Sequence, residues 1–348
     1  MPNIHDVAKL AGVHRSTVSR VLTGKGAVSE KSRKKVLEVA HKMNFHLNTV
    51  ASALKSQRKS AIGLLSFWNC SPNPSEAYYQ HILTGIIDEI TRSKFHLLLN
   101  NVQGTLHPEN EQIKFCYESM LGGILLMAPR IKDEEEINFI TRFNIPAILL
   151  LYRPTDNRYS WVDLDNRKGA RLAVDHLIEL GHKRIAFIGG ELEYSSNARD
   201  RYFGYQESLK KAGLKEDENL VRNGFFWEGY GEESMKYFLT LPPAQRPTAV
   251  FAATDAIAFG AMKAAQEAGL NIPRDLSIVG LDDYEKASLS SPTLTTVRQP
   301  FHEIGKQAVQ LLETMIKNRS SKPQHLLIKP ELIVRDSTAR PPKTGKAI

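Results

Sequence analysis

The chain has little of what would mark a secreted, membrane-bound or disulfide-stabilised protein. Its 348 residues include two cysteines, Cys70 and Cys116, which cannot form a disulfide framework and fit packed thiols in a reducing compartment. No apolar run approaches the ~18 residues of a membrane span, and no signal-peptide hydrophobic region stands near residue 1. We therefore expect a cytoplasmic protein that does not associate with membranes.

The sequence also lacks the short motifs through which many enzymes bind phosphates, metals or substrates. It has no Gly-x-x-x-x-Gly-Lys-Ser/Thr phosphate loop, no Gly-x-Gly-x-x-Gly after a strand, no Cys/His metal spacing and no nucleophile elbow. The neighbours Asp282 and Asp283 could suggest acid–base chemistry, but adjacent loop residues normally point apart. We expect no catalytic residue, no metal and no cofactor.

Acidic residues are scarce at one end of the chain. Residues 1–60 hold 12 Lys/Arg against 3 Asp/Glu, whereas the remaining residues hold 34 against 35. The net charge of +8 therefore arises entirely in the first sixth of the sequence. A basic excess concentrated in this way predicts that this end binds a polyanion such as nucleic acid.

The basic segment has the pattern of three short helices. Apolar residues in 4–11 recur at helical spacing, and Gly12 permits the positive φ of a tight turn. The next helix has an apolar side and a polar, basic side, and a third helix, at about 30–44, begins after the candidate N-cap Ser29. The first two helices alone fit any small helical hairpin. With the charge and the third helix, they favour a helix-turn-helix whose second helix enters the DNA major groove.

From residue 61 the pattern changes to short apolar strands that alternate with helices. The pattern restarts near residue 162, which predicts two doubly wound parallel-sheet halves in series. Ligands of such sheets bind at the carboxyl ends of the strands. We expect domains at 1–47 (helix-turn-helix), 48–60 (hinge and linker), 61–337 (sensor) and 338–348 (tail). Within the sensor, we expect one subdomain of about 61–161 plus 293–322 and another of about 162–291 plus 323–337.

Several motifs resemble the lactose-repressor/galactose-repressor (LacI/GalR) family of bacterial transcription factors. The N-terminal ones are Ile4-His5-Asp6-Val7-Ala8, Thr17-Val18-Ser19-Arg20-Val21-Leu22, Val28-Ser29 and Val50-Ala51-Ser52-Ala53-Leu54. In the body, similar signatures occur at 165–170, 176–182, 201–205, 255–261, 280–283 and 292–297. The resemblance implies an all-α helix-turn-helix DNA-binding domain joined to an α/β periplasmic-binding-protein-like (type I) sensor.

The resemblance also implies how the chain meets DNA. A homodimer would bind a near-palindromic double-stranded operator, and a hinge helix at 50–56 would fold there and wedge a leucine into the minor groove. Arg20 could contact a guanine edge or a phosphate, and the sequence leaves both open. The expected DNA-binding residues are Arg15, Ser16, Thr17, Arg20, Asn48, Leu54 and Lys55.

Arg201 and Asp282 match the family's ligand-clamping arginine and aspartate. A guanidinium and a carboxylate together suit a polyhydroxylated molecule, because each hydroxyl can both donate and accept. Asp255 opens a helix, so it could cap that helix or contact the ligand, and either Phe226 or Trp227 could supply an aromatic wall. The expected effector-binding residues are Phe67, Tyr79, Arg201, Phe226, Thr254 and Asp282.

These expectations describe a transcriptional regulator, by family default a repressor of carbohydrate-utilisation genes, controlled by a small sugar-like effector. The alternative is a carbon-control regulator that answers to a partner protein or a phosphorylated metabolite as corepressor. Thr254 and Tyr152 depart from the residues many sugar-binding relatives have, so no particular sugar is predicted. The tail lacks heptads, which favours a dimer without a tetramerising coil.

Overall fold

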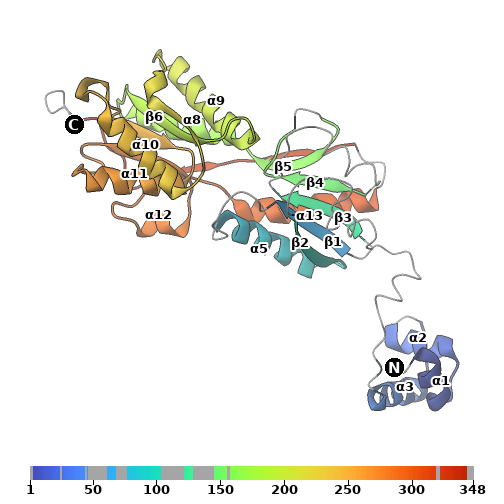
Figure 1. Ribbon diagram of the computed structural model, residues 1–348. Coiled ribbons are helices and arrows are strands. Elements are labelled where there is room, and N and C mark those ends of the chain that lie inside the picture. Colours follow the sequence, from blue (N-terminus) through green and yellow to red (C-terminus); the bar gives the residue numbers. More distant parts are fainter. Residues whose placement is uncertain are drawn as a thin grey trace. The chain divides into compact units, whose positions relative to one another are not determined.

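The computed structural model describes residues 3–23, 26–43, 45, 61–67, 77–102, 121–127, 145–154, 157–318 and 322–342 (Figure 1). The chain divides into two compact units, Met1–Ser60 and Ala61–Ile348. Within the described residues, no helix combines the length and the apolar character needed to cross a membrane.

The N-terminal unit contains three helices, α1 (Ile4–Ala11), α2 (Arg15–Thr23) and α3 (Glu30–Lys42). The Asn3 side chain accepts hydrogen bonds from the backbone N–H groups of His5 and Asp6, and Asp6 accepts one in return from the Asn3 N–H. This capping box satisfies N–H groups that have no partner inside the helix. Gly12 ends α1 with φ 63°, as the sequence predicts, and Ser29 caps α3.

The three helices enclose a small apolar core. Val7, Ala11, Val18 and Val36, which come from all three helices, are each fully buried. This packing requires the apolar faces predicted from the helical spacing, and it turns the remaining faces of α2 toward solvent. The predicted helix-turn-helix is therefore confirmed, although α3 ends at Lys42 and not near residue 44.

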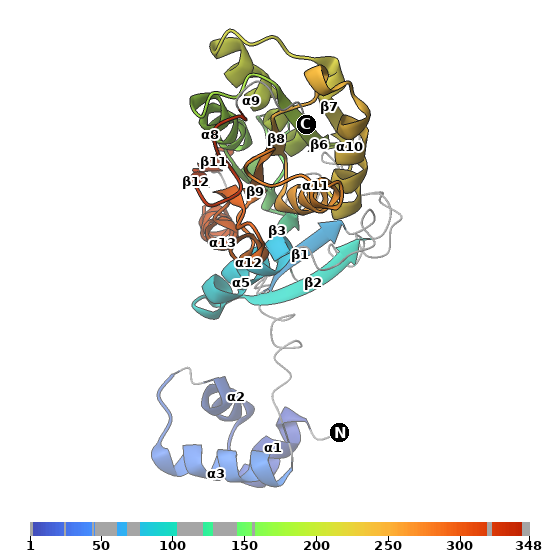
Figure 2. The ribbon, with the colours of Figure 1, turned by 90° about the vertical axis from the view of Figure 1, so that its left-hand side faces the viewer.

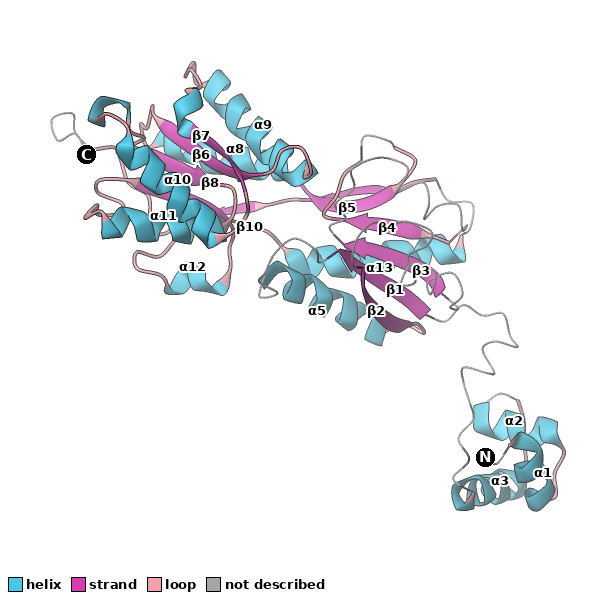
Figure 3. Ribbon diagram, in the orientation of Figure 1, coloured by secondary structure: helices cyan, strands magenta, loops and turns pink. Residues whose placement is uncertain are grey.

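The larger unit holds two sheets of six described strands each (Figure 3). The first, sheet A, is parallel throughout and has the order β11-β5-β4-β3-β1-β2. Helices α5 (Ala77–Thr91) and α13 (Phe301–Lys317) pack together on one of its faces. The strands are β1 (Ala61–Phe67), β2 (His96–Val102), β3 (Leu121–Met127), β4 (Ala147–Leu150), β5 (Ser160–Leu164) and β11 (His325–Ile328). Sheet A with these helices is called the first lobe.

Sheet B has the order β12-β10-β9-β8-β6-β7, and its pairs are parallel except β10 with β12. The strands are β6 (Ile185–Gly190), β7 (Val221–Gly224), β8 (Ala249–Ala252), β9 (Ser277–Asp282), β10 (Thr295–Arg298) and β12 (Glu331–Ile333). The helices of this lobe are α8 (Asn166–Glu179), α9 (Ser196–Lys211), α10 (Glu228–Thr240), α11 (Asp255–Glu267) and α12 (Glu285–Leu289), with short 3-10 turns η1 (Glu218–Leu220) and η2 (Pro243–Gln245). Sheet B with these helices is called the second lobe.

Both faces of sheet B are covered (Figure 2). Along β6, Ile185 and Phe187 pack with α8 and α9, whereas Ala186 and Ile188 pack with α10 and α11. Alternate residues of one strand thus enter different cores, which explains why the strand reads as a continuous apolar run. The predicted fold class, with two doubly wound α/β subdomains, is confirmed.

The assignment of the last segments to the two subdomains differs from the expectation. Residues 295–298 form β10, which pairs with β9 in sheet B, although the sequence placed 293–322 in the first subdomain. Residues 325–328 form β11, which pairs with β5 in sheet A and not in the second subdomain. The physical reason is that Leu294 and Val297 are buried in the cores of sheet B, while β11 covers the open edge of β5. Of the segment 293–322, α13 does pack on sheet A.

The described part of the expected tail is also bonded into the second lobe. His182, which is buried, contacts the Thr248 hydroxyl at 2.9 Å through Nδ1 and the Ala339 carbonyl at 2.8 Å through Nε2. Burial lowers the pKa of this imidazole below its ordinary value. His176 contacts the Thr338 hydroxyl at 2.9 Å. Residues just beyond 337 therefore belong to the lobe structurally.

Candidate functional site

The predicted recognition helix, α2, presents a polar face. Arg15, Ser16 and Arg20 are exposed and Thr17 is half-buried, whereas Val18 on the opposite side is fully buried. Side chains early in such a helix are those that reach base edges when it lies in a major groove. The structure therefore leaves the four predicted contacts on α2 available to DNA.

His14 is a residue of this face that the sequence analysis missed. Its Nδ1 lies 2.8 Å from the Ser16 hydroxyl and accepts from the Ser16 backbone N–H at 3.3 Å. The ring thus occupies the start of α2 and orients one of the predicted contacts. The remaining predicted DNA contacts, Asn48, Leu54 and Lys55, lie outside the described residues.

Arg201, on α9, is held at the edge of sheet B where its strands end. The side chain is 6% exposed, its Nε donates to Asn166 Oδ1 at 2.8 Å, and a terminal nitrogen donates to the Ala253 carbonyl at 2.6 Å. Burial lowers the pKa of the guanidinium, and the nearby Asp282 carboxylate opposes that shift. These bonds fix the direction of the fork before any ligand arrives.

Asp282 ends β9 at the same edge and is 4% exposed. Its carboxylate accepts from the Gln299 side-chain amide at 2.5 Å and from the Asp255 backbone N–H at 3.3 Å. Burial and the neighbouring Asp255 raise the pKa of Asp282 well above its ordinary value, and Arg201 counteracts them. With φ values of 154° and 61°, Asp282 and Asp283 have a backbone that L residues rarely adopt, and such strain clusters at binding sites.

Phe226 is the member of its aromatic run that faces Arg201. The guanidinium carbon lies 5.6 Å from the centre of the Phe226 ring, a cation–π arrangement. The ring rests on the last residue of β6, Gly190, where a Cβ atom would come within 2.4 Å of it, so only glycine fits. Phe225 and Trp227 are 46% and 43% exposed. Of the two candidates for the aromatic wall, Phe226 and Trp227, the structure therefore favours Phe226.

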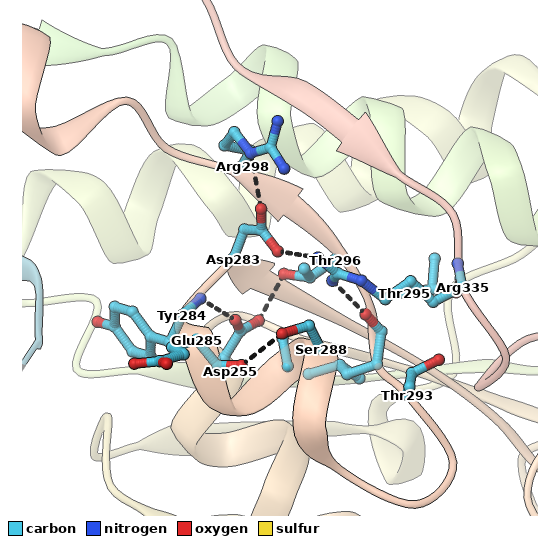
Figure 4. Close-up of polar contacts among 12 residues, drawn as sticks. Asp255, Asp283, Tyr284, Glu285, Ser288, Thr293, Thr295, Thr296, Arg298 and Arg335 are labelled. Atoms are coloured by element: carbon cyan, nitrogen blue, oxygen red, sulfur yellow. Dashed lines mark hydrogen bonds and ion pairs between the residues drawn. The ribbon is translucent and has the colours of Figure 1, made fainter.

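Asp255 does not have the helix-capping role that the sequence left open for it. Thr254, and not Asp255, caps α11, because its side-chain oxygen accepts from the Ile257 N–H at 3.2 Å. Asp255 is fully buried and accepts from the Thr296 hydroxyl at 2.5 Å and from the Tyr284 N–H at 2.9 Å (Figure 4). Burial raises its pKa to about 6. Asp255 therefore anchors the loop that carries Asp282.

The next carboxylate of that loop, Asp283, joins it to the last strands of the second lobe (Figure 4). It accepts from Arg298 and from Arg335, each at 2.6 Å, and its side chain is 7% exposed. Arg335 also donates to the Leu294 carbonyl at 2.8 Å. Asp282 and Asp283 thus have different partners, as expected of adjacent loop residues.

Asp163 and Asn166, where the chain leaves β5 for α8, lie near Arg201 but were not predicted as site residues. Both are buried, at 0% and 1% exposure, and Asn166 is the residue to which Arg201 Nε donates. A carboxylate inside the apolar strand 160–164 was the available signal, since buried acids are rare without a partner. These two residues belong to the surroundings of Arg201.

The predicted contacts from the first lobe are less defined. Tyr79 lies on α5, half-buried against the core of sheet A. Phe67 is the last residue of β1, and its side chain lies outside the described part.

The lobes are joined by polar contacts near Arg201. Arg153, in the loop after β4, forms an ion pair with Asp200 of α9, and its backbone N–H donates to the Ser196 hydroxyl at 3.1 Å. Asn197 donates to the Leu151 carbonyl at 3.1 Å. The N-terminal turns of α9, the helix that carries Arg201, are thus tied to both lobes.

The chemistry of this site is suited to binding. Within the described ranges, no group of three or more His, Cys, Asp or Glu side chains could hold a metal ion. What the site offers is a fixed guanidinium, an aromatic face and buried carboxyls, the groups that orient a polar ligand.

Comparison with known proteins covers nearly the whole chain. Residues 3–48 match the family model for bacterial regulatory proteins of the lacI family, and residues 174–338 match a periplasmic binding protein-like domain. The HTH-type transcriptional regulator RegA of Clostridium saccharobutylicum is 32% identical over 97% of this chain and 99% of its own. The chain belongs to the lacI family of bacterial regulatory proteins.

Solved structures agree with this lacI-family assignment. The Lac repressor dimer bound to operator and the anti-inducer ONPF is similar with a TM-score of 0.84 and 27% identity, over 97% of this chain and 99% of that one. The complex of the transcriptional regulator CelR with cellobiose is similar with a TM-score of 0.73 and 30% identity, over 97% of this chain and 100% of that one. RegA, the Lac repressor and CelR are transcriptional regulators by name, and this chain is a DNA-binding regulator of the same family.

Proposed function

We propose that this lacI-family chain is a cytoplasmic, non-enzymatic repressor that binds a near-palindromic operator as a homodimer. A small polyhydroxylated effector, held where the strands of sheet B end, sets its operator affinity. The observation that carries the proposal is the pairing of a buried, pre-oriented guanidinium, Arg201, with a buried carboxyl, Asp282, at that edge. Neutral polyols need such donor–acceptor pairs, because each hydroxyl both donates and accepts.

The relatives support the two halves of this proposal. The Lac repressor structure is a dimer on operator DNA, and the CelR structure contains cellobiose. In this chain, Arg15, Ser16, Thr17 and Arg20 would contact the operator, with Asn48, Leu54 and Lys55 in the hinge. Phe226 and Thr254 would line the effector site beside Arg201 and Asp282, with Phe67 and Tyr79 from the first lobe.

The mechanism is a linkage between two binding equilibria. Operator DNA favours one arrangement of the two lobes, and the effector can shift it only by its differential affinity for the arrangements. Arg153 and Asn197 make contacts between the lobes at the start of α9, the helix that carries Arg201, so a ligand at Arg201 would act on the first lobe through these contacts.

A two-step experiment tests the proposal with the full chain. A thermal-shift screen of monosaccharides, disaccharides and sugar phosphates finds the effector, and a ligand at 100 times its Kd stabilises the protein by about 2.7 kcal/mol. Operator selected from a random duplex pool is then titrated with and without that compound. We expect a change in operator affinity of about 5- to 150-fold. A bound sugar that leaves operator affinity unchanged contradicts the proposal.

A further inference from the structure

Asp163 has a buried side-chain oxygen to which no described residue donates a hydrogen bond. Its side chain is fully buried, and Oδ1 accepts from the Leu164 N–H at 2.8 Å and lies 3.5 Å from Asn166 Nδ2. Oδ2 is buried too, and it has no hydrogen-bond partner among the described residues. Buried carboxylate oxygens are seldom left in this state, so an unmet one calls for a functional explanation.

Asp163 is linked to the effector-clamping arginine through a single amide. Asn166 accepts from Arg201 Nε through its Oδ1 at 2.8 Å. Its Nδ2 donates to Asn197 Oδ1 at 3.1 Å and to the Leu164 carbonyl at 3.2 Å, and it lies 3.5 Å from Asp163 Oδ1. The three residues come from or directly begin three different elements, β5, α8 and α9. A ligand that reaches the Arg201 guanidinium therefore arrives next to the Asp163 carboxyl.

The charge balance of this region restricts the ligand. Three fully or nearly buried carboxyls, Asp163, Asp255 and Asp282, surround the guanidinium of Arg201. Arg153 also lies near Asp163, and it is ion-paired with Asp200. Where these acids are ionised, a phosphate or carboxylate on the ligand would add a further negative charge beside them, at a high cost in a buried site.

We propose that Asp163 is a ligand-contacting residue of the effector site, whose Oδ2 accepts a hydrogen bond from a hydroxyl or ammonium group. The effector class is a polyhydroxylated molecule, neutral or amino-bearing, that has neither phosphate nor carboxylate. This inference rests on the proposed function. It makes the phosphorylated-metabolite alternative incompatible with the site.

The first test needs no ligand. Asp163→Asn keeps an oxygen for the Leu164 N–H bond and removes the buried acid, whose pKa burial raises to about 7 despite Arg153, Arg201, the Leu164 N–H and Asn166. At pH 8 we expect the melting temperature of the free protein to rise by about 2 °C or more. A lower melting temperature, or failure to fold, would show that Oδ2 has a structural partner and would overturn the proposal.

The second test uses defined probes on the full chain: ribose, cellobiose, glucosamine, glucose 6-phosphate and gluconate. We expect stabilisation of the wild type by at least one of the first three and by neither of the two anions. For that binder, Asp163→Asn should weaken Kd about 10- to 150-fold, the effect of losing a hydrogen bond to a charged group. Asp175→Asn, on α8 and paired with Lys211 at 3.3 Å, is the matched control and should leave Kd unchanged.

The outcomes separate this inference from the proposed function. Equal Kd values for wild type and Asp163→Asn, or tight binding of glucose 6-phosphate or gluconate, overturn the role of Asp163 while a sugar-controlled repressor stands. A wild type that no probe stabilises counts against the proposed effector class itself, and the Asp163 proposal falls with it.

Discussion

At the scale of single residues, the site is defined by how completely its charged groups are tied down before a ligand arrives. Arg201 donates to an amide and to a carbonyl, and it lies over an aromatic ring. Preorganisation of this kind reduces the entropy lost on binding. It also makes the site sensitive to substitutions that preserve charge but not shape.

Arg201→Lys should therefore lose the effector while the protein stays folded. An ammonium cannot donate to Asn166 and Ala253 with the fork geometry of a guanidinium, nor stack on Phe226 in the same way. We expect effector affinity to fall at least tenfold, which is about 1.4 kcal/mol. Isothermal titration with the effector measures this, and an operator titration without effector serves as control. Unchanged effector affinity would remove Arg201 from the ligand contacts.

The raised pKa of Asp163 predicts how the destabilising effect of this buried carboxyl on the folded protein depends on pH. The carboxyl has a pKa of 3.8 in the unfolded chain and about 7 when folded, so between these values the folded state retains more protons. The wild type therefore loses stability as the pH rises from about 4 to 7, and Asp163→Asn does not lose this contribution. The free energy of unfolding of the variant should exceed that of the wild type by an amount that grows from pH 5 to pH 8 and reaches about 1–3 kcal/mol. The difference between their melting temperatures should grow over the same range. An advantage that does not change with pH would contradict this account.

At the scale of elements, the second lobe depends on close approaches between helices. Helices α10 and α11 meet at glycines, and a Cβ atom on Gly260 would lie 1.8 Å from the Glu228 carbonyl oxygen. One on Gly231 would lie 2.0 Å from the Ile257 carbonyl oxygen. Because α11 begins at the Thr254–Asp255 step beside Arg201, this contact fixes part of the site as well as the core.

A pair of glycine substitutions tests this contact. Gly260→Ala should destabilise the protein by about 1–3 kcal/mol, because the backbone of α10 must move away. Gly229→Ala, in the first turn of α10, meets no atom within 4 Å and should be neutral or stabilising by up to about 1 kcal/mol. Thermal unfolding of both variants measures the difference. Similar melting temperatures would show that the helices tolerate the extra methyl.

Elements with a strong local signal were predictable from the sequence. The capped helices α1 and α3 lie within a few residues of their predicted ranges, and the predicted alternation of short apolar strands with helices from residue 61 is present in both lobes. α10 has a weak local signal, because its start, Glu228-Gly229-Tyr230-Gly231, has poor helix propensity and is stabilised by packing against α11. The lobe assignments of β10 and β11 were wrong, because nothing in a short strand specifies which distant edge it will pair with.

The site was predictable where a family motif marks a residue and not where burial alone gives it a role. Arg201 and Asp282 do lie at one edge of sheet B, as the topology of parallel strands requires. The capping role of Thr254 and the anchoring role of Asp255 depend on partners 3 and 41 positions away in sequence, and the burial of Asp163 Oδ2 depends on tertiary packing. Periodicity carries no information about such partners.

At the scale of the whole molecule, charge separates the two tasks. The basic excess lies in residues 1–60, where Arg15 and Arg20 are exposed on α2, whereas the remaining chain is nearly neutral. Attraction to the DNA backbone therefore comes from the N-terminal unit alone. The two-lobed unit can respond to an uncharged ligand without a change in that attraction.

Arg20→Ala distinguishes the two contacts that the sequence left open. If Arg20 reads a guanine, binding should lose about 1–3 kcal/mol at one symmetric pair of operator positions and discrimination there should relax. Titrations of duplexes with each base at those positions measure this, at several salt concentrations. Uniform weakening on all sequences, with a salt slope lower by about 1, identifies a phosphate contact.

The most direct test of the whole account is the binding of the full chain to a selected near-palindromic duplex, measured by fluorescence anisotropy with and without the effector found by thermal shift. We predict that the protein binds this duplex at least 10³-fold more tightly than a scrambled one, and that the effector changes the affinity at least fivefold. Failure to bind any double-stranded DNA at low salt, or equal affinity for every sequence whether or not the effector is present, would contradict it.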